Sequence, residues 1–498
     1  MKKTMVFLAA VSSLSLCTAA PVIRAGSVSF SQNPGSRQVC VTYVLDEDPG
    51  IVTFDVQTNG VSIGARHMKP LAGDVNRLVQ PGENKKIFWR PDKAWPGHKI
   101  TDGSVSVVVT AWATNTPPDY MMIDLAGGSQ IPAAERTTYY THPDAIPFEG
   151  GVSNDLCKTD YLVFRKCPAA NVTWRMGTTA TEQGSPEKVP TAHYVTFTND
   201  FWMAVYELTQ RQFSHFIEWP SGDQDRGYFG CCFTNAAAMR PVEFVQYYWL
   251  RGWSDINASQ IAAGTRKYWP ETGHDIKQSD ACGGRWGSPY LNNPLYTLRN
   301  LTGQTVDFPT EAQWEFAARA GQGGNLPDGT AFAATVDGES GAARLHRYAR
   351  TAGNGGVVNG IPAKCETAAS GVLSATGAAD DVWRQKRETG LSSVLPSDGG
   401  TAVVGSYLPN AWGFYDMNGN VAEFCLDNWT ASEEMSEASV TDPAGPPTAG
   451  KDRVARGGSW ADAEADCLSS SRSLARSDGS VVSYGFNWVG FRLCIVIP

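Results

Sequence analysis

The sequence of 498 residues has no run of lysine or arginine, and its 41 basic residues are outnumbered by 50 acidic ones. The resulting net charge of −9 provides no electrostatic footprint for nucleic acid or for an anionic membrane surface. Beyond the N-terminus, the sequence also lacks the run of about 20 apolar residues that a transmembrane helix needs. We therefore expect neither nucleic-acid binding nor membrane insertion.

Several catalytic and metal-binding signatures are also missing. No G-x-S-x-G elbow, P-loop or dinucleotide fingerprint occurs, which disfavours the enzyme classes that depend on them. The seven histidines are scattered without ligand spacing, so a non-haem iron site is disfavoured. The 11 cysteines include no C-x-x-C pair of the kind that binds zinc.

The N-terminus has the features of a signal peptide. Lys2 and Lys3 precede an apolar run over residues 5–16, and small residues follow at positions 18–20. We expect residues 1–20 to be removed and the mature chain to be exported to a periplasm, the cell surface or the medium.

Cysteine usage adds two expectations to export. Cys17 leaves a lipoprotein interpretation open, although Leu16 stands where a small residue normally precedes a lipidated cysteine. Disulfides are expected among the remaining cysteines because exported proteins fold in an oxidising compartment. Cys157 and Cys167 flank a strand-like run and could attach it to a neighbour.

The remaining sequence divides into two expected domains. Alternating apolar residues with Gly, Pro and Asn turns between residues 25 and 125 are typical of a small antiparallel β-sandwich of the fibronectin or immunoglobulin kind. Residues 126–151 are rich in Gly, Pro and Ala and indicate a linker. Residues 152–498 predict an α+β domain with much loop and with helices over 209–218 and 310–320.

The segment over 310–320 carries a helix-start signature. Thr310 can cap the first turn, and Gln313 three residues later can complete a capping box. Glu315 and Arg319 have the i, i+4 spacing that favours an ion pair on a helix. We expect this helix to be scaffold rather than a catalytic element.

Several short motifs follow one another through the second domain. They are RMG (175–177) with VYELTQRQF (205–213), FPTEAQWEFAARAG (308–321), NAWGFYDMNGNVAEF (410–424), and RVARGGSW (453–460) with GFRL (490–493). In this order they resemble the formylglycine-generating enzyme, or sulfatase-modifying factor, family over residues 152–498. The resemblance implies a C-type-lectin-like fold with twisted antiparallel strands, two helices and ordered loops.

The segment YDMNGNVAEF is the candidate calcium site. Asp416 and Glu423 supply hard oxygen ligands, and the glycine turn between them can direct carbonyl oxygens inward. Spacing alone equally fits a turn with a solvated glutamate. The resemblance implies structural calcium held by the side chains of Asp416 and Glu423 and by the carbonyls of Gly419 and Val421.

The candidate catalytic positions follow the GGSW sequence. The resemblance implies two cysteines that bind copper(I) and oxidise a substrate cysteine with O₂, and paired thiolates are suitable ligands for that ion. The first of these positions holds Asp462 and the second holds Cys467, so only one thiolate remains and a copper site is doubtful. Cys467 is instead expected to be structural, with a bridge to Cys425 as one option; another cysteine completing a metal site is a further option.

Two functions remain open on this basis. The preferred one is a secreted family member without oxidase activity that recognises a polypeptide or a glycan, with residues 461–488, which are small and polar, as its surface. The alternative is an active oxidoreductase that converts a sulfatase cysteine to formylglycine, using Cys467 and an unidentified partner. The oligomeric state stays open.

Overall fold

The chain is represented by a computed structural model that describes residues 20–98, 104–178, 192–217, 237–243, 245, 247–251, 294–354, 357–358, 361–362, 400–429, 439–444, 452–476 and 488–498. Residues 1–19 of the expected signal peptide lie outside this part. The chain divides into two compact units, Met1–Pro117 and Pro118–Pro498. In the described ranges, no helix combines the length and apolar character that a membrane crossing requires.

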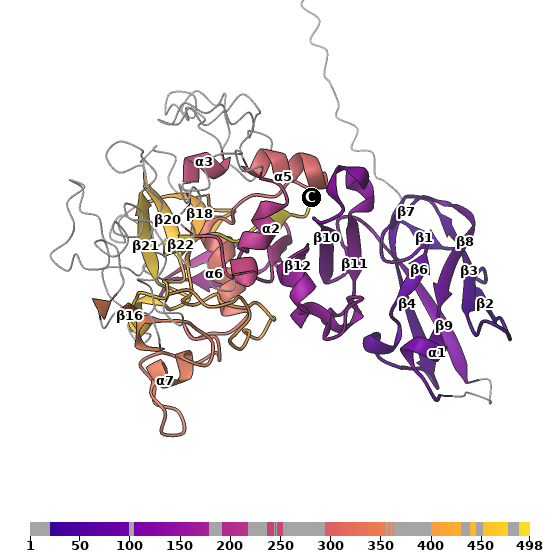
Figure 1. Cartoon of the computed structure of the whole chain (residues 1–498), viewed down its shortest axis with the longest axis horizontal. Helices are drawn as coiled ribbons and strands as arrows, with labels where there is room; N and C mark the ends of the chain where they lie inside the picture. Colours follow the sequence, from indigo (N-terminus) through magenta and orange to yellow (C-terminus); the bar gives the residue numbers. More distant parts are fainter. Residues whose placement is uncertain are drawn as a thin grey trace, which may run out of the picture. The chain divides into compact units, whose positions relative to one another are not determined.

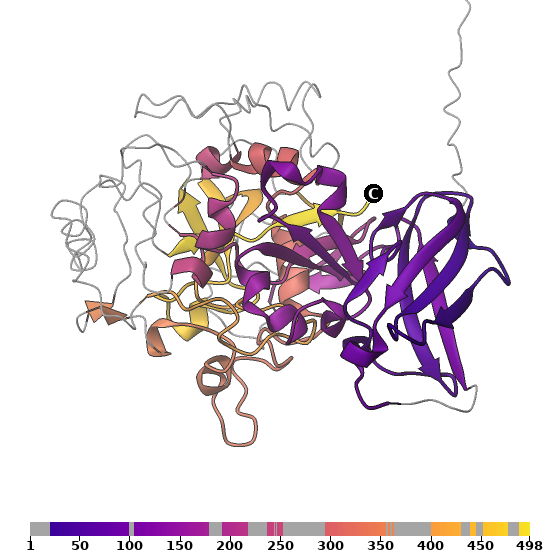
Figure 2. The same cartoon turned by 45° about the vertical axis from the view of Figure 1, so that its right-hand side comes forward.

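The first unit is built from two antiparallel sheets (Figure 1). One sheet contains β1 (Val22–Ile23), β2 (Ser29–Gln32), β3 (Val39–Asp46), β6 (Leu71–Gly73) and β8 (Gly82–Trp89). The other contains β4 (Gly50–Thr58), β5 (Val61–Ser62), β7 (Leu78–Val79) and β9 (Val105–Trp112), and α1 (Pro91–Ala94) follows β8. The two sheets face each other (Figure 2). Their side chains, among them Val41, Val52 and Ile87, form one hydrophobic core.

The second unit is centred on a five-stranded antiparallel sheet. Its order is β11-β10-β12-β15-β23, with bounds β10 (Tyr120–Asp124), β11 (Thr137–Tyr140), β12 (Tyr161–Cys167), β15 (Phe201–Ala204) and β23 (Cys494–Val496). The expectation of a first domain reaching residue 125 and a linker over 126–151 is wrong at this point, because β10 and β11 are strands of this sheet. The reason is long-range pairing: the apolar residues of β10 are buried between two strands of the second unit.

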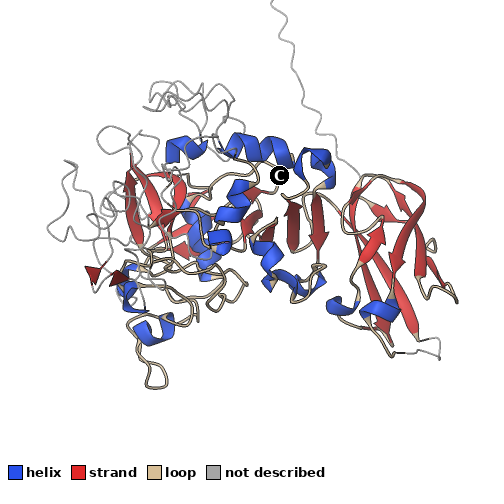
Figure 3. Ribbon diagram, in the orientation of Figure 1, coloured by secondary structure: helices blue, strands red, loops and turns tan. Residues whose placement is uncertain are grey.

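Smaller sheets and short helices surround the central sheet, and loops connect them (Figure 3). The strands are β13 (Thr173–Met176), β14 (His193–Thr196), β16 (Val357–Val358), β17 (Ile361–Pro362), β18 (Ala422–Asn428), β19 (Val440–Thr441), β20 (Asp452–Arg456), β21 (Arg472–Arg476) and β22 (Val489–Gly490). The helices are α2 (Gln210–Ser214), α3 (Tyr247–Arg251), α5 (Pro294–Thr302), α6 (Glu311–Arg319) and α7 (Gly341–Leu345). The described fold is thus mixed and mostly β, with few helices.

Helix α6 begins at the capping box that the sequence predicts. The Thr310 hydroxyl accepts a hydrogen bond from the Gln313 backbone N–H at 3.2 Å, and the Gln313 side chain accepts one from the Thr310 N–H at 2.9 Å. A second capping box, between Thr209 and Gln212, starts α2. All nine residues of α6 are buried, including its charged residues, so this helix runs through the interior of the second unit.

Candidate functional site

The loop over residues 416–421 enters β18 and carries the calcium candidate. Asp416 and Gly419 both have positive φ, and a side chain at Gly419 would fall on the Arg350 carbonyl oxygen. The Gly405 N–H donates to one oxygen of the Asp416 carboxylate at 2.6 Å. The other oxygen, Oδ1, is buried and has no hydrogen-bond partner among the described residues. An orphaned buried carboxylate oxygen of this kind calls for a cation or a donor.

Glu423 lies at the start of β18 and is already paired. The Arg492 Nη2 donates to its carboxylate at 2.8 Å, and the Trp314 indole N–H donates at 2.7 Å. Arg492 also donates to the backbone carbonyls of Ala204 and Val205, at 2.9 Å each. Arg492 thus satisfies a buried carboxylate and two backbone carbonyls at once.

A third carboxylate, which the sequence analysis did not identify, belongs to the same site. Glu207 is fully buried and accepts hydrogen bonds from the Asn420 amide at 2.6 Å and from the Val421 N–H at 3.1 Å. Burial raises the pKa of Glu207 well above its usual value, and the charges of Asp416 and Glu423 raise it further. The available sequence signal was an acidic residue inside the apolar run of VYELT.

Asp416 lies in the same buried, acidic environment as Glu207. Burial raises its pKa to about 6, and the charge of Glu423 acts in the same direction, whereas the Gly405 N–H and the Arg492 guanidinium oppose the shift. Three buried carboxylates therefore lie around one guanidinium. In the described part of the chain, no group of three or more His, Cys, Asp or Glu side chains has the geometry to hold a metal ion.

The second candidate region is the loop over 457–467, which follows β20. The Ser459 hydroxyl donates to the Asp462 carboxylate at 2.6 Å, and the Cys467 thiol donates to the Ser459 carbonyl at 3.6 Å. Cys467 is completely buried, and a side chain at Gly458 would meet its Sγ at 2.7 Å. Ser459 thus connects the two positions that the motif singles out.

The electrostatic environment suppresses the thiolate form of Cys467. Burial raises the pKa of this thiol well above its usual value, and the carboxylates of Asp462, Asp466 and Glu464 raise it further. Glu464 lies in the short helix η11 (Glu464–Asp466), where the His346 ring bonds its carboxylate at 2.6 Å. Cys467 is therefore a protonated, unreactive thiol in this conformation.

The bridge between Cys425 and Cys467 is not formed. Both cysteines are free, and so is Cys167, one of the two cysteines that could attach the strand-like run to a neighbour. Cys425 packs in the core cluster that contains Trp314, whereas Cys467 packs in a separate cluster around α7. The expected pairing of Cys425 with Cys467 was wrong, because the two loops lie next to each other while the two cysteine side chains pack in different clusters. Four other cysteines, Cys231, Cys232, Cys282 and Cys365, lie outside the described residues.

The expected recognition surface over 461–488 is only partly at the surface. Residues 463–466 are exposed or half-buried, but residues 467–472 are buried. Residues 477–487 lie outside the described residues.

The calcium-candidate loop and the Cys467 loop are bonded to each other. The Asn418 amide nitrogen donates to the Cys467 carbonyl at 2.7 Å. The Gly419 N–H donates to the Gly457 carbonyl, and the Trp460 N–H donates to the Asn420 carbonyl, each at 2.8 Å. The 416–421 loop leads into β18, and the 457–467 loop follows β20. These two strands pair with each other (Figure 1).

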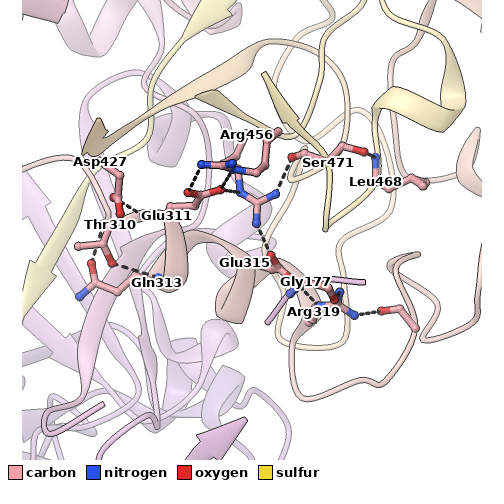
Figure 4. Close-up of polar contacts among 12 residues, drawn as sticks. Gly177, Thr310, Glu311, Gln313, Glu315, Arg319, Asp427, Arg456, Leu468 and Ser471 are labelled. Carbon is pink, nitrogen blue, oxygen red and sulfur yellow. Dashed lines mark hydrogen bonds and ion pairs between the residues drawn. The ribbon is translucent and has the colours of Figure 1, made fainter. Parts of the chain in front are cut away.

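A buried charge network supports this site from α6 (Figure 4). Glu315 accepts from Arg319 at 2.7 Å, as the i, i+4 spacing predicts, and is also bonded by Arg456. Glu311 pairs with Arg472 of β21 at 3.0 Å, and its backbone N–H donates to Asp427 of β18 at 2.7 Å. These groups connect α6 to the sheet that carries both loops.

The fold and the site together define an α+β protein with two bonded loops around a buried cysteine. A family model described as "Sulfatase-modifying factor enzyme 1-like domain" matches residues 166–497. This chain therefore belongs to the sulfatase-modifying factor family.

Individual relatives cover less of the chain. The formylglycine-generating enzyme of Thermomonospora curvata is 39% identical over 92 residues, which is 18% of this chain and 30% of that enzyme. The enzyme of Streptomyces coelicolor is 30% identical over 184 residues, or 37% of this chain and 45% of that enzyme. The chain thus spans less than half the length of these curated relatives.

Two solved structures show weaker similarity. Treponema denticola variable protein 1 has 20% identity and a TM-score of 0.37, covering 67% of this chain and 95% of that one. PvdO from Pseudomonas aeruginosa has 18% identity and a TM-score of 0.37, covering 67% and 94%.

Proposed function

We propose that this chain is an exported family member that has lost copper-dependent cysteine oxidation and acts in recognition of a polypeptide or a glycan. The observation that carries the proposal is Asp462, which stands at the first of the two cysteine positions and accepts a hydrogen bond from Ser459. A carboxylate is a hard ligand, and copper(I) prefers soft thiolates. The residues at these positions do not fit copper.

The state of the remaining cysteine supports the same conclusion. A metal-binding or nucleophilic cysteine works as a thiolate and sits in an electropositive, partly exposed environment. Cys467 is fully buried, and three carboxylates raise the pKa of its thiol. Its surroundings thus oppose both copper binding and attack on a substrate.

Calcium fits the residues better than copper. We assign it to the Asp416 and Glu423 side chains and the Gly419 and Val421 carbonyls, and the orphaned Oδ1 of Asp416 is the ligand atom that supports this assignment. The cation would offset the repulsion among the buried carboxylates of Asp416, Glu423 and Glu207. It would brace the loop and take no part in a reaction.

The finer fold assignments belong to the same proposal. A C-type-lectin-like second unit holds long loops on a rigid scaffold, and such loops can recognise a ligand after catalysis is lost. Residues 463–466, which are exposed or half-buried, are the accessible part of the described loop for this role. The first unit, as a small β-sandwich, would serve as an accessory module.

Titration of the reduced protein with copper(I) tests the loss of oxidase chemistry. Wild type is expected to bind no stoichiometric copper at this site, and Asp462→Cys is expected to gain a site because it restores two thiols. If wild type bound one copper ion that disappeared in Cys467→Ser, the proposal would be wrong and the oxidoreductase alternative would take its place.

Binding arrays test the second part of the proposal, which is the recognition of a polypeptide or a glycan. Purified wild-type protein is applied to glycan and peptide arrays, with Ala463→Trp as the variant at the exposed position of the loop. A ligand whose binding falls in that variant supports recognition through the loop; conversion of a sulfatase peptide cysteine to formylglycine by wild type would contradict it.

A further inference from the structure

The calcium-candidate loop, residues 416–421, is hydrogen-bonded to Cys467 and to the loop that contains it. Asn418 lies between Asp416 and Gly419 in the sequence and is 1% exposed. Its amide nitrogen donates to the Cys467 carbonyl at 2.7 Å, which fixes the backbone of the cysteine itself. The backbone of Gly458 also lies against Cys467 and leaves no room for a side chain beside its thiol.

Two backbone hydrogen bonds extend this contact along both loops. They join Gly419 to Gly457 and Asn420 to Trp460, so residues 418–420 are bonded to the 457–467 loop at three successive positions. A movement of the 416–421 loop therefore breaks bonds that hold the Cys467 loop.

The 416–421 loop is the electrostatically unfavourable part of this contact. Its Asp416 is buried, and the Oδ1 atom of the carboxylate has no hydrogen-bond partner among the described residues. Arg492 offsets part of the negative charge, and its guanidinium is already shared with Glu423 and with backbone carbonyls. A cation at Asp416 Oδ1 would supply the missing partner and would thereby stabilise this loop position.

We infer that divalent-cation binding at the Asp416 loop controls the chemical accessibility of Cys467, with Asn418 as the positioning residue that transmits it. The inference rests on the calcium ligation proposed above. If opening the loop releases the cation, the open population falls by the factor one plus the ratio of calcium concentration to Kd. At a calcium concentration of 100 times Kd, exposure of the thiol falls about 100-fold.

Pulsed alkylation of the reduced full-length protein measures this coupling. N-ethylmaleimide is applied in calcium chloride, in magnesium chloride and in EGTA, and each cysteine is quantified by mass spectrometry. Cys467 is expected to react about 100-fold more slowly in saturating calcium than in EGTA. Cys167 on β12 packs in a different cluster and reports global unfolding, so it is the internal reference.

Two matched variants separate the coupling from calcium binding itself. Asn418→Asp keeps the side-chain size and removes the N–H donor to Cys467, so calcium should still bind while its protection of the thiol is lost. Asn199→Asp is the control, because the Asn199 amide donates to the Ile497 carbonyl at 2.8 Å and belongs to neither loop. It should retain the wild-type protection. Calcium affinity is measured for each protein by isothermal titration.

The contrary outcomes are distinct. If calcium binds wild type and leaves the alkylation rate of Cys467 unchanged, or if Asn418→Asp keeps full protection, the coupling is wrong and the proposed loss of copper chemistry is unaffected. If calcium does not bind, both the calcium assignment and the coupling fail. The copper titration judges the proposed function independently of either result.

Discussion

At the scale of single residues, burial changes what the acidic side chains do. Glu311, Glu315 and Glu423 are each almost fully buried, and each is paired with a buried arginine. In water these carboxylates would ionise freely, whereas in the interior an ionised group without a partner costs several kcal/mol, about 3 to 5 when one partner is removed. Charge pairing at this scale therefore decides the local conformation.

Asp427 provides a pH test of this principle. Burial raises its pKa to about 7, and the Glu311 charge contributes in the same direction, from a usual value of 3.8. A carboxyl group with a raised folded pKa binds more protons in the folded state, so its contribution to stability is full below about pH 4 and is lost as the pH rises through about 7. Wild type should lose free energy of unfolding relative to Asp427→Asn between about pH 4 and pH 7, and the difference should be constant above about pH 8.

Urea unfolding of both proteins at a series of pH values measures the difference. Asp155→Asn is the control, since Asp155 is exposed and its replacement should leave the pH dependence of wild type in place. Parallel stability curves for wild type and Asp427→Asn would show that Asp427 does not titrate in this range.

At the scale of secondary-structure elements, α6 is the helix that connects several strands of the second unit. Its residues contact β13, β18 and β20, and its charges pair with arginines of β20 and β21 (Figure 4). The capping box at Thr310 sets where the helix begins, and that starting point places Glu311 and Glu315 opposite their partners.

Removing the cap should weaken the second unit. Thr310→Ala deletes the acceptor for the Gln313 N–H and is expected to lower the free energy of unfolding by about 1 kcal/mol, or up to about 2 because the donor is buried. Thr310→Ser keeps the hydroxyl and should cost less. Urea unfolding followed by tryptophan fluorescence gives both values, and equal losses for the two variants would argue against the cap as the cause.

At the scale of the whole molecule, the unit boundary is set by strand pairing. Residues 118–125 follow the last strand of the first unit, yet β10 lies between β11 and β12 of the second. A fragment of residues 118–498 keeps this strand, whereas a fragment of residues 126–498 lacks it.

These fragments have different expected outcomes. The fragment from residue 118 should unfold in a cooperative transition, because the second unit has its own cores. The fragment from residue 126 should aggregate or lose cooperativity, since β11 and β12 then expose unpaired edges and apolar residues. Circular dichroism melts and size-exclusion chromatography measure both properties. A stable, monomeric fragment from residue 126 would contradict the assignment of β10.

Local sequence determined several features of this protein. The Thr310 and Gln313 pair gave the start of α6, the spacing of Glu315 and Arg319 gave their ion pair, and ordered motifs gave the family. These features depend on neighbours within a few residues, or on short motifs, so the sequence contains them directly. The proposal that Asp462 stands where the family has a cysteine likewise comes from the sequence motif alone.

Only the tertiary structure decided the partners that lie far apart in the chain. Glu207 joined Asp416 and Glu423, Cys467 was separated from Cys425, and β10 was taken into the second unit. Periodicity cannot specify these outcomes, because burial, strand pairing and charge neutralisation depend on which distant segments pack together. The sequence set the chemistry available at each position, and packing determined which groups meet.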